Sequence, residues 1–135
     1  MILLKDAIDA LEGTSIETIY YYNKRTNEIL YANEFDDTYN TYTDESEFDD
    51  DIIVMFDYRD KDDYEIMQDF IQTIRDVELR KKLYHNTSGK GAFRMFRYLI
   101  DEAGITNDWY QYRDDKYKEI ALEWCYKNNI DLKEE

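Results

Sequence analysis

The stretch that indicates the fold most clearly runs from Ile16 to Tyr31 and reads IETIYYYNKRTNEILY. Its two ends, residues 16–22 and 29–31, are rich in β-branched and aromatic residues, which favour strands. Residues 23–27, which lie between these ends, are polar and include two Asn, a residue type that tolerates turn conformations. This pattern predicts an antiparallel hairpin, and the apolar run from Ile52 to Phe56 predicts a third strand.

Helical periodicity dominates the rest of the chain. Residues 3–11 place apolar side chains at helical spacing, and the same spacing recurs from Asp62 onward. Asp62 and Asp76 are acidic residues at positions that suit helix N-termini. Residues 90–103 form a strongly amphipathic segment, and a last helix follows over 108–128. We therefore expect an α+β fold with a small antiparallel N-terminal sheet and a helical C-terminal half.

Length and composition limit the kind of protein this is. The chain has 135 residues, of which 43% are hydrophobic and 16% aromatic, and this predicts a single folded domain over residues 1–135. The only cysteine, Cys125, excludes an internal disulfide framework and favours a cytoplasmic location. Because no apolar run approaches the ~20 residues of a membrane-spanning helix, no membrane association is expected.

Charge is distributed unevenly along the chain. Asp and Glu number 32 against 17 Lys and Arg, for a formal net charge of −15. Residues 34–65 hold 14 acidic and two basic residues, whereas residues 80–97 hold six basic residues and no acidic one. The overall excess repels phosphates and so disfavours nucleic acid as a partner. The two segments are also able to attract each other, which leaves a homo-oligomer as an alternative.

The most acidic part of the chain is predicted to be a mobile loop at about residues 33–51. Like charges at this density oppose compaction, while the aromatic residues among them offer contact area. Such a surface speeds the encounter with a cationic partner. Our leading hypothesis is a non-enzymatic interaction domain that binds a basic protein partner as an inhibitor or regulator. The candidate partner-binding residues are Phe35, Asp36, Asp37, Tyr39, Tyr42, Asp49, Asp50 and Asp51.

A glycine-rich turn before the amphipathic helix supports an alternative function. Two glycines let a backbone approach a ligand closely, and a helix N-terminus attracts anions. A phosphate loop is excluded, because Tyr84 stands where that motif requires glycine and Gly91 where it requires Ser or Thr. The turn either packs two helices or binds nucleic acid or a phosphate ligand. The candidate anion-binding residues are Gly89, Lys90, Gly91, Arg94 and Arg97.

Arg113 lies on a predicted apolar helix face, one turn after Trp109 and one turn before Tyr117. An unpaired buried charge is costly. We therefore expect Arg113 and Trp109 to form a structural pair, in which the arginine makes an ion pair with a carboxylate of another helix and stacks on the indole. Binding of a ligand is the alternative role for Arg113.

The sequence contains no pattern that indicates catalysis, a cofactor or a metal. Asp57, Asp60 and Asp62 alternate along the chain but lack the glycine and the closing glutamate of a calcium loop. His85 and Cys125 are too few and too far apart for a zinc site. Enzyme activity is left open, and its absence is favoured.

Three C-terminal motifs resemble a known family. They are GKGAFRMFR at residues 89–97, WYQYRD at 109–114 and EIALEWC at 119–125, and shorter matches occur at 64–67, 69–71 and 6–11. The chain resembles uncharacterised protein family 0158, which consists of small acidic bacterial proteins with no established activity. The resemblance implies that several motif residues act as one unit, namely Gly91, Phe93, Arg94, Phe96, Trp109, Arg113 and Trp124.

Overall fold

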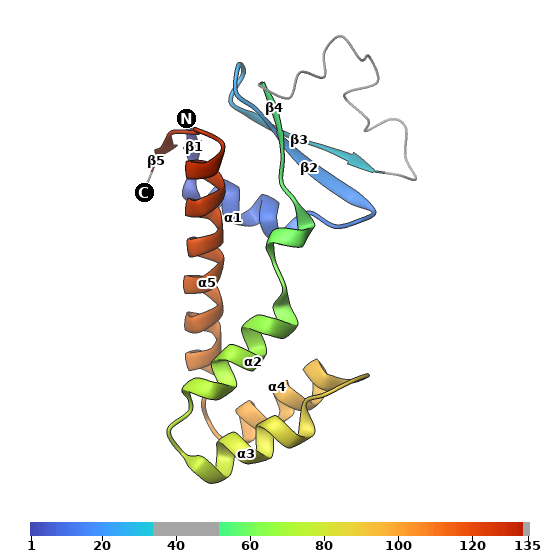
Figure 1. Cartoon of the computed structure of the whole chain (residues 1–135), viewed down its shortest axis with the longest axis vertical. Coiled ribbons are helices and arrows are strands. Elements are labelled where there is room, and N and C mark those ends of the chain that lie inside the picture. Colours follow the sequence, from blue (N-terminus) through green and yellow to red (C-terminus); the bar gives the residue numbers. More distant parts are fainter. Residues whose placement is uncertain (34–51, 134–135) are drawn as a thin grey trace. The chain divides into compact units, whose positions relative to one another are not determined.

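The computed structural model describes residues 1–33 and 52–133 (Figure 1). These residues form two compact units: a sheet unit of residues 1–33, 52–61 and 117–133, and a helical unit of residues 62–116. The α+β fold is confirmed, while the single domain stays a prediction. The eight candidate partner-binding residues between Phe35 and Asp51 lie outside the described residues.

The sheet unit contains the predicted hairpin and third strand. Strands β2 (Thr18–Asn23), β3 (Glu28–Asn33) and β4 (Ile53–Met55) form an antiparallel sheet in the order β3-β2-β4 (Figure 1). In this register Tyr22 is opposite Ile29 on one side and Val54 on the other. The hairpin turn is stabilised by the Asn23 side chain, which accepts hydrogen bonds from the backbone N–H groups of residues 25 and 26.

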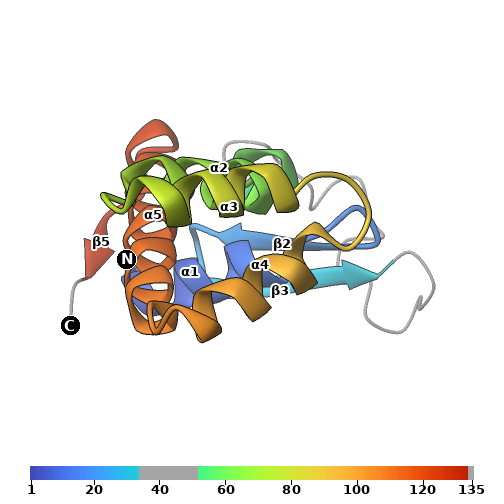
Figure 2. The same ribbon diagram turned by 90° about the horizontal axis from the view of Figure 1, so that it is seen from below.

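Helix α1 (Leu4–Gly13) lies beside β2 (Figure 2) and follows a short strand, β1 (Ile2–Leu3). Strand β1 pairs in parallel with β5 (Leu132–Lys133). Helix α1 ends at Gly13. A Cβ atom at Gly13 would lie 2.9 Å from the Tyr20 ring, so this glycine allows a tyrosine of β2 to pack closely against α1.

The core of the sheet unit is centred on Trp124, which lies in the last part of helix α5 (Thr106–Lys127). Its indole stacks on Phe56 with a centroid distance of 4.0 Å, and Tyr22 meets it edge-on at 6.3 Å. All three side chains are at most 2% exposed. Tyr22 of β2 is therefore part of the core, while Tyr20 and Tyr21 are half-buried. A 3₁₀ turn, η3 (Tyr58–Asp60), follows β4.

The helical unit consists of α2 (Asp63–Thr73), α3 (Val77–Asn86), α4 (Ala92–Glu102) and the first part of α5 (Figure 2). The predicted caps are confirmed, because Asp62 accepts a hydrogen bond from the N–H of Glu65 and Asp76 from the N–H of Glu78. Helix α4 begins two residues later than predicted, after Gly91, whose φ of 81° favours glycine.

Three large rings form the centre of the helical unit. Phe70 of α2 meets Phe96 of α4 at 6.0 Å and Trp109 of α5 at 5.4 Å, both edge-on. Phe96 and Trp109 contact each other at 4.9 Å with an interplanar angle of 86°. These contacts hold the rings of Phe96 on α4 and Trp109 on α5 in place next to each other.

Candidate functional site

A cavity of about 330 Å³ opens in the helical unit between residues of α2, α4 and α5. Its volume lies at the lower end of the range of small-molecule sites, roughly 300–1,000 Å³. We name it the aromatic–arginine pocket, because four of its seven lining residues are aromatic and two are arginines. It is lined by Asp63, Phe93, Phe96, Arg97, Trp109, Tyr110 and Arg113.

Buried rings form the inner surface of this pocket. Phe96 is fully buried and Trp109 is 5% exposed. Both are held by Phe70 in the ring cluster described above, so they provide a rigid apolar surface. The indole N–H of Trp109 has no acceptor within residues 1–33 and 52–133 and is accessible to solvent, since Thr106 Oγ1 is the only fully buried side-chain polar atom without a partner in these ranges.

The remaining lining residues follow from helical spacing. Phe93 and Arg97 are one turn apart on α4, as are Trp109 and Arg113 on α5, so each pair shares a helix face. Tyr110 is 53% exposed and Phe93 is 37% exposed. Each helix therefore contributes an aromatic ring and a guanidinium to the same opening.

The charges of the pocket are two guanidiniums and one carboxylate, Asp63, at the start of α2. Arg97 is exposed, and its side chain makes no hydrogen bond or ion pair with any residue that the structure describes. Arg113 is half-buried. Asp63 is a carboxylate on another helix, as predicted for the partner of Arg113, and it lines the same pocket; the ion pair itself stays a prediction.

The five candidate anion-binding residues differ in whether they line the pocket. Arg97 alone among them lines the pocket, while Lys90 and Arg94 are exposed outside its lining. Gly89 and Gly91 form an exposed turn with positive φ angles. Sequence reasoning did not include Asp63 or Tyr110, although the three-residue spacing from Tyr110 to Arg113 is a helical signal that places both on neighbouring positions.

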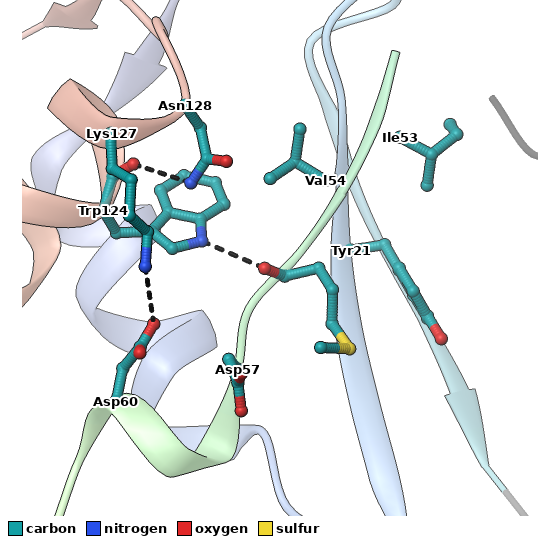
Figure 3. A pocket seen from close by; sticks show the side chains of 9 residues that line it. Tyr21, Ile53, Val54, Asp57, Asp60, Trp124, Lys127 and Asn128 are labelled. Atoms are coloured by element: carbon teal, nitrogen blue, oxygen red, sulfur yellow. Dashed lines mark hydrogen bonds and ion pairs between the residues drawn. The ribbon is translucent and has the colours of Figure 1, made fainter. Parts of the chain in front are cut away.

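A second cavity, of about 370 Å³, lies in the sheet unit, and we name it the Trp124 pocket (Figure 3). The indole Nε1–H of Trp124 donates to the carbonyl oxygen of Met55 at 3.0 Å, and Asn128 donates to the carbonyl oxygen of Trp124 at 2.8 Å. Lys127 lies 4.0 Å from Asp60. The full lining is Tyr21, Ile53, Val54, Met55, Asp57, Asp60, Trp124, Lys127 and Asn128.

The charged groups of the Trp124 pocket have partners within it or next to it. Arg59 donates to Asp57 from Nε at 2.9 Å and from its terminal nitrogen at 2.8 Å. These hydrogen bonds hold the pKa of the Asp57 carboxyl below its ordinary value. Burial raises the pKa of the Tyr21 hydroxyl, which keeps it neutral. The arrangement is that of a structural joint between β4 and the end of α5.

The reactive residue types lie outside both pockets. Cys125 is 3% exposed, and burial raises the pKa of its thiol, which disfavours the nucleophilic thiolate. His85 is in the last turn of α3, with its ring 5.5 Å from Tyr84. In the described ranges, no group of three His, Cys, Asp or Glu side chains is arranged to hold a metal ion.

None of the helices in residues 1–33 and 52–133 combines the length and the apolar character needed to cross a bilayer.

Comparison with known proteins supports the motif resemblance. UPF0158 protein PA5073 of Pseudomonas aeruginosa is 27% identical over 66 residues, which cover 48% of this chain and 43% of that protein. The matched stretch thus spans less than half of its length. No solved structure matches the chain. The sequence profile of the uncharacterised protein family UPF0158 matches residues 1–135. The chain therefore belongs to the uncharacterised protein family UPF0158.

Proposed function

We propose that the protein is a non-enzymatic binding protein whose helical unit captures an anionic ligand in the aromatic–arginine pocket. The observation that carries this proposal is Arg97, a guanidinium in the lining of a cavity and without a partner among the described residues. A second guanidinium, Arg113, lines the same cavity. The sequence raises binding of nucleic acid or a phosphate ligand at the helix start over residues 89–97 as an alternative, and our proposal assigns the phosphate ligand to Arg97 and Arg113 instead.

Physical chemistry favours an anion at this place. Arginine presents planar donors that match phosphate and carboxylate oxygens in pairs. Rings next to the guanidiniums exclude part of the water, which strengthens the electrostatic attraction. The six basic residues of segment 80–97 add positive potential near α4, although the whole chain carries −15.

Calorimetric titration of the full chain with inorganic pyrophosphate tests this proposal. We expect binding that weakens as salt is raised and that falls about 10-fold in Arg97→Gln, in line with the loss of a charge-assisted hydrogen bond. Arg94→Gln is the matched control, because Arg94 is exposed on the same helix but outside the pocket lining. No binding to the wild type, or equal loss in both variants, would contradict the proposal.

A second proposal rests on the charge of the sequence. The net charge of −15 and the 14 acidic residues of segment 34–65 support binding of a basic protein partner in the cytoplasm, with aromatic residues as anchors. Capture from a host lysate should recover a basic protein at low salt and lose it at high salt. Replacing Asp49, Asp50 and Asp51 with Asn should weaken the capture, and capture that is insensitive to salt would refute this role.

A further inference from the structure

We infer that the ligand of the aromatic–arginine pocket is a free mononucleotide, that is, a planar base joined to a phosphate through a sugar. The inference rests on the anion binding proposed above and adds the chemical class of the ligand. It depends on four properties of the pocket: its size and rings, the exposure of those rings, its polar groups, and its net charge.

Size and lining indicate a ligand larger than an inorganic anion. The cavity measures about 330 Å³, and four of its seven lining residues are aromatic. A phosphate ion would contact the guanidiniums and leave most of the ring surface against water. A ligand with a flat apolar part covers both kinds of surface, as small-molecule sites generally do.

The exposed rings are suited to stacking. Tyr110 and Phe93 lie at the opening with 53% and 37% of their surface exposed, while Phe96 and Trp109 are held deeper. Bases stack on aromatic side chains irrespective of their sequence, and one such contact changes affinity by about 10-fold or more. Guanidinium planes also stack on bases, so Arg113 can contact the base while Arg97 binds the phosphate.

The polar groups distinguish a nucleotide from a simpler aromatic phosphate. The Trp109 indole N–H has no acceptor in the described part of the chain, and base carbonyls or phosphate oxygens supply one. Asp63 lines the pocket, and a carboxylate accepts several hydrogen bonds at once. Sugar hydroxyls and base amino groups are donors for that carboxylate, whereas a phosphorylated phenol has none.

The charge balance favours a free mononucleotide over a nucleic-acid strand. Two guanidiniums and one carboxylate leave the pocket with a single net positive charge. This suits a ligand with one phosphate group. A strand would bring further phosphates towards a chain whose net charge is −15, and that repulsion opposes its binding.

Calorimetry of the full chain with a defined set of probes tests the inference. The probes are the four ribonucleoside 5′-monophosphates, their nucleosides, inorganic phosphate, phenyl phosphate and an eight-residue oligoadenylate. We expect at least one monophosphate to bind about 10-fold or more tightly than its nucleoside, inorganic phosphate and phenyl phosphate, because only the nucleotide contacts the rings, the arginines and Asp63 together.

Two variants test which residue contacts the phosphate and which contacts the base. Arg97→Gln should weaken the nucleotide about 10-fold and leave the nucleoside unchanged, whereas Tyr110→Ala should weaken both to a similar extent. The matched controls are Arg94→Gln and Tyr98→Ala, both on exposed α4 positions outside the pocket lining. The controls should leave both affinities unchanged.

The outcomes separate this inference from the proposed function. If inorganic phosphate binds in an Arg97-dependent manner and no nucleotide binds more tightly, the proposal of anion binding stands and the inference of a nucleotide ligand is wrong. If phenyl phosphate binds as tightly as the nucleotides, the inferred contacts with the sugar and the base are wrong. Tighter binding of oligoadenylate than of adenosine monophosphate overturns the choice of a free nucleotide. If no anion binds, both proposals fail.

Discussion

The two pockets are similar in volume, at about 330 and 370 Å³, and each has a buried tryptophan in its lining. They differ in how their polar groups are satisfied. In the Trp124 pocket the indole N–H donates to the Met55 carbonyl oxygen. In the aromatic–arginine pocket Asp63 and Arg113 also have partners, whereas the Trp109 N–H and the Arg97 side chain have none within the described ranges.

This difference teaches that volume alone does not identify a ligand site. Native structures pair nearly all of their buried polar groups, so a cavity whose groups are already paired is a joint between elements. The Trp109 N–H and the Arg97 guanidinium are accessible to solvent, so both can donate to a bound molecule that supplies acceptors. Substitutions in each pocket test whether the Trp124 pocket is structural and the aromatic–arginine pocket binds a ligand.

The largest expected effect is that of Trp124→Ala. It removes the stack on Phe56 and the edge contact with Tyr22, and large-to-small changes of this kind cost about 3–5 kcal/mol of unfolding free energy. Urea unfolding followed by circular dichroism measures the loss. A cost below ~1 kcal/mol would show that the Trp124 pocket is not a structural joint.

The two phenylalanine variants sharpen the same comparison. Trp124→Phe keeps most of the stacking but leaves the Met55 carbonyl without its donor, which costs about 1–3 kcal/mol. Trp109→Phe loses no hydrogen bond within the described part of the chain and should cost less. Equal losses would contradict the contrast between the two indoles.

Two buried threonines provide the next comparison. Thr14 Oγ1 donates to the Phe56 carbonyl oxygen at 2.9 Å and accepts from the Tyr20 N–H at 3.2 Å, so it ties the end of α1 to the sheet. Thr87, the residue that follows α3, donates from Oγ1 to the Leu83 carbonyl oxygen in the last turn of that helix at 2.6 Å. We expect the free energy of unfolding to fall by about 2 kcal/mol in Thr14→Val and by about 1 kcal/mol in Thr87→Val.

Thermal and urea unfolding of both valine variants check this order, because valine matches threonine in shape and the difference isolates the hydroxyl. A larger loss for Thr87→Val would mean that the contact between α1 and the sheet contributes less than a local helix cap.

The two arginines of the aromatic–arginine pocket should also differ. Arg113 is half-buried, so Arg113→Ala should cost about 1–2 kcal/mol through lost packing and polar contacts. Arg97→Ala should change stability by less than ~0.5 kcal/mol, as exposed substitutions do. Urea unfolding of the two variants is the measurement, and a loss below ~0.5 kcal/mol for Arg113→Ala would show that its helix face is misassigned.

Local signals in the sequence predicted local structure well. The hairpin follows from β-branched and aromatic residues on both sides of a polar turn, and the caps at Asp62 and Asp76 follow from side chains that reach N–H groups two or three residues away. Such features depend on neighbours along the chain. They can therefore be read without knowledge of the tertiary fold.

The features that were not predicted depend on residues far apart in sequence. The indole of Trp124 meets a carbonyl 69 residues away, and no pattern in either segment specifies that contact. The aromatic–arginine pocket likewise needs α2, α4 and α5 together, so Asp63 gave no signal of its own. The close contact of Gly13 with the Tyr20 ring is likewise visible only in the fold.

The smallest expected effect concerns Asp57, whose side chain caps η3 by accepting the Arg59 N–H at 2.8 Å and also binds the guanidinium. Hydrogen bonding by Arg59 lowers the carboxyl pKa below its ordinary value of about 3.8. A pKa that is lower in the folded state stabilises the protein above the unfolded value, and this stabilisation is lost as pH falls through the folded value. The contribution should therefore be complete at about pH 6–8, where the carboxyl group is ionised in both the folded and the unfolded state.

Asp57→Asn tests this, because asparagine keeps the capping oxygen and removes the charge. The cost at pH 7 should be about 0.5 kcal/mol or less, since Arg59 is 71% exposed and such ion pairs are screened. Urea midpoints of wild type and variant, compared at pH 7 and at successively lower pH, should converge as Asp57 becomes protonated. Asp60→Asn is the matched control, because its ion pair with Lys127 spans 4.0 Å and its removal should cost less. A difference in urea midpoint between Asp57→Asn and wild type that widens as pH falls would mean that the carboxylate opposes folding. The paired charges of the Trp124 pocket would then no longer distinguish it from the aromatic–arginine pocket.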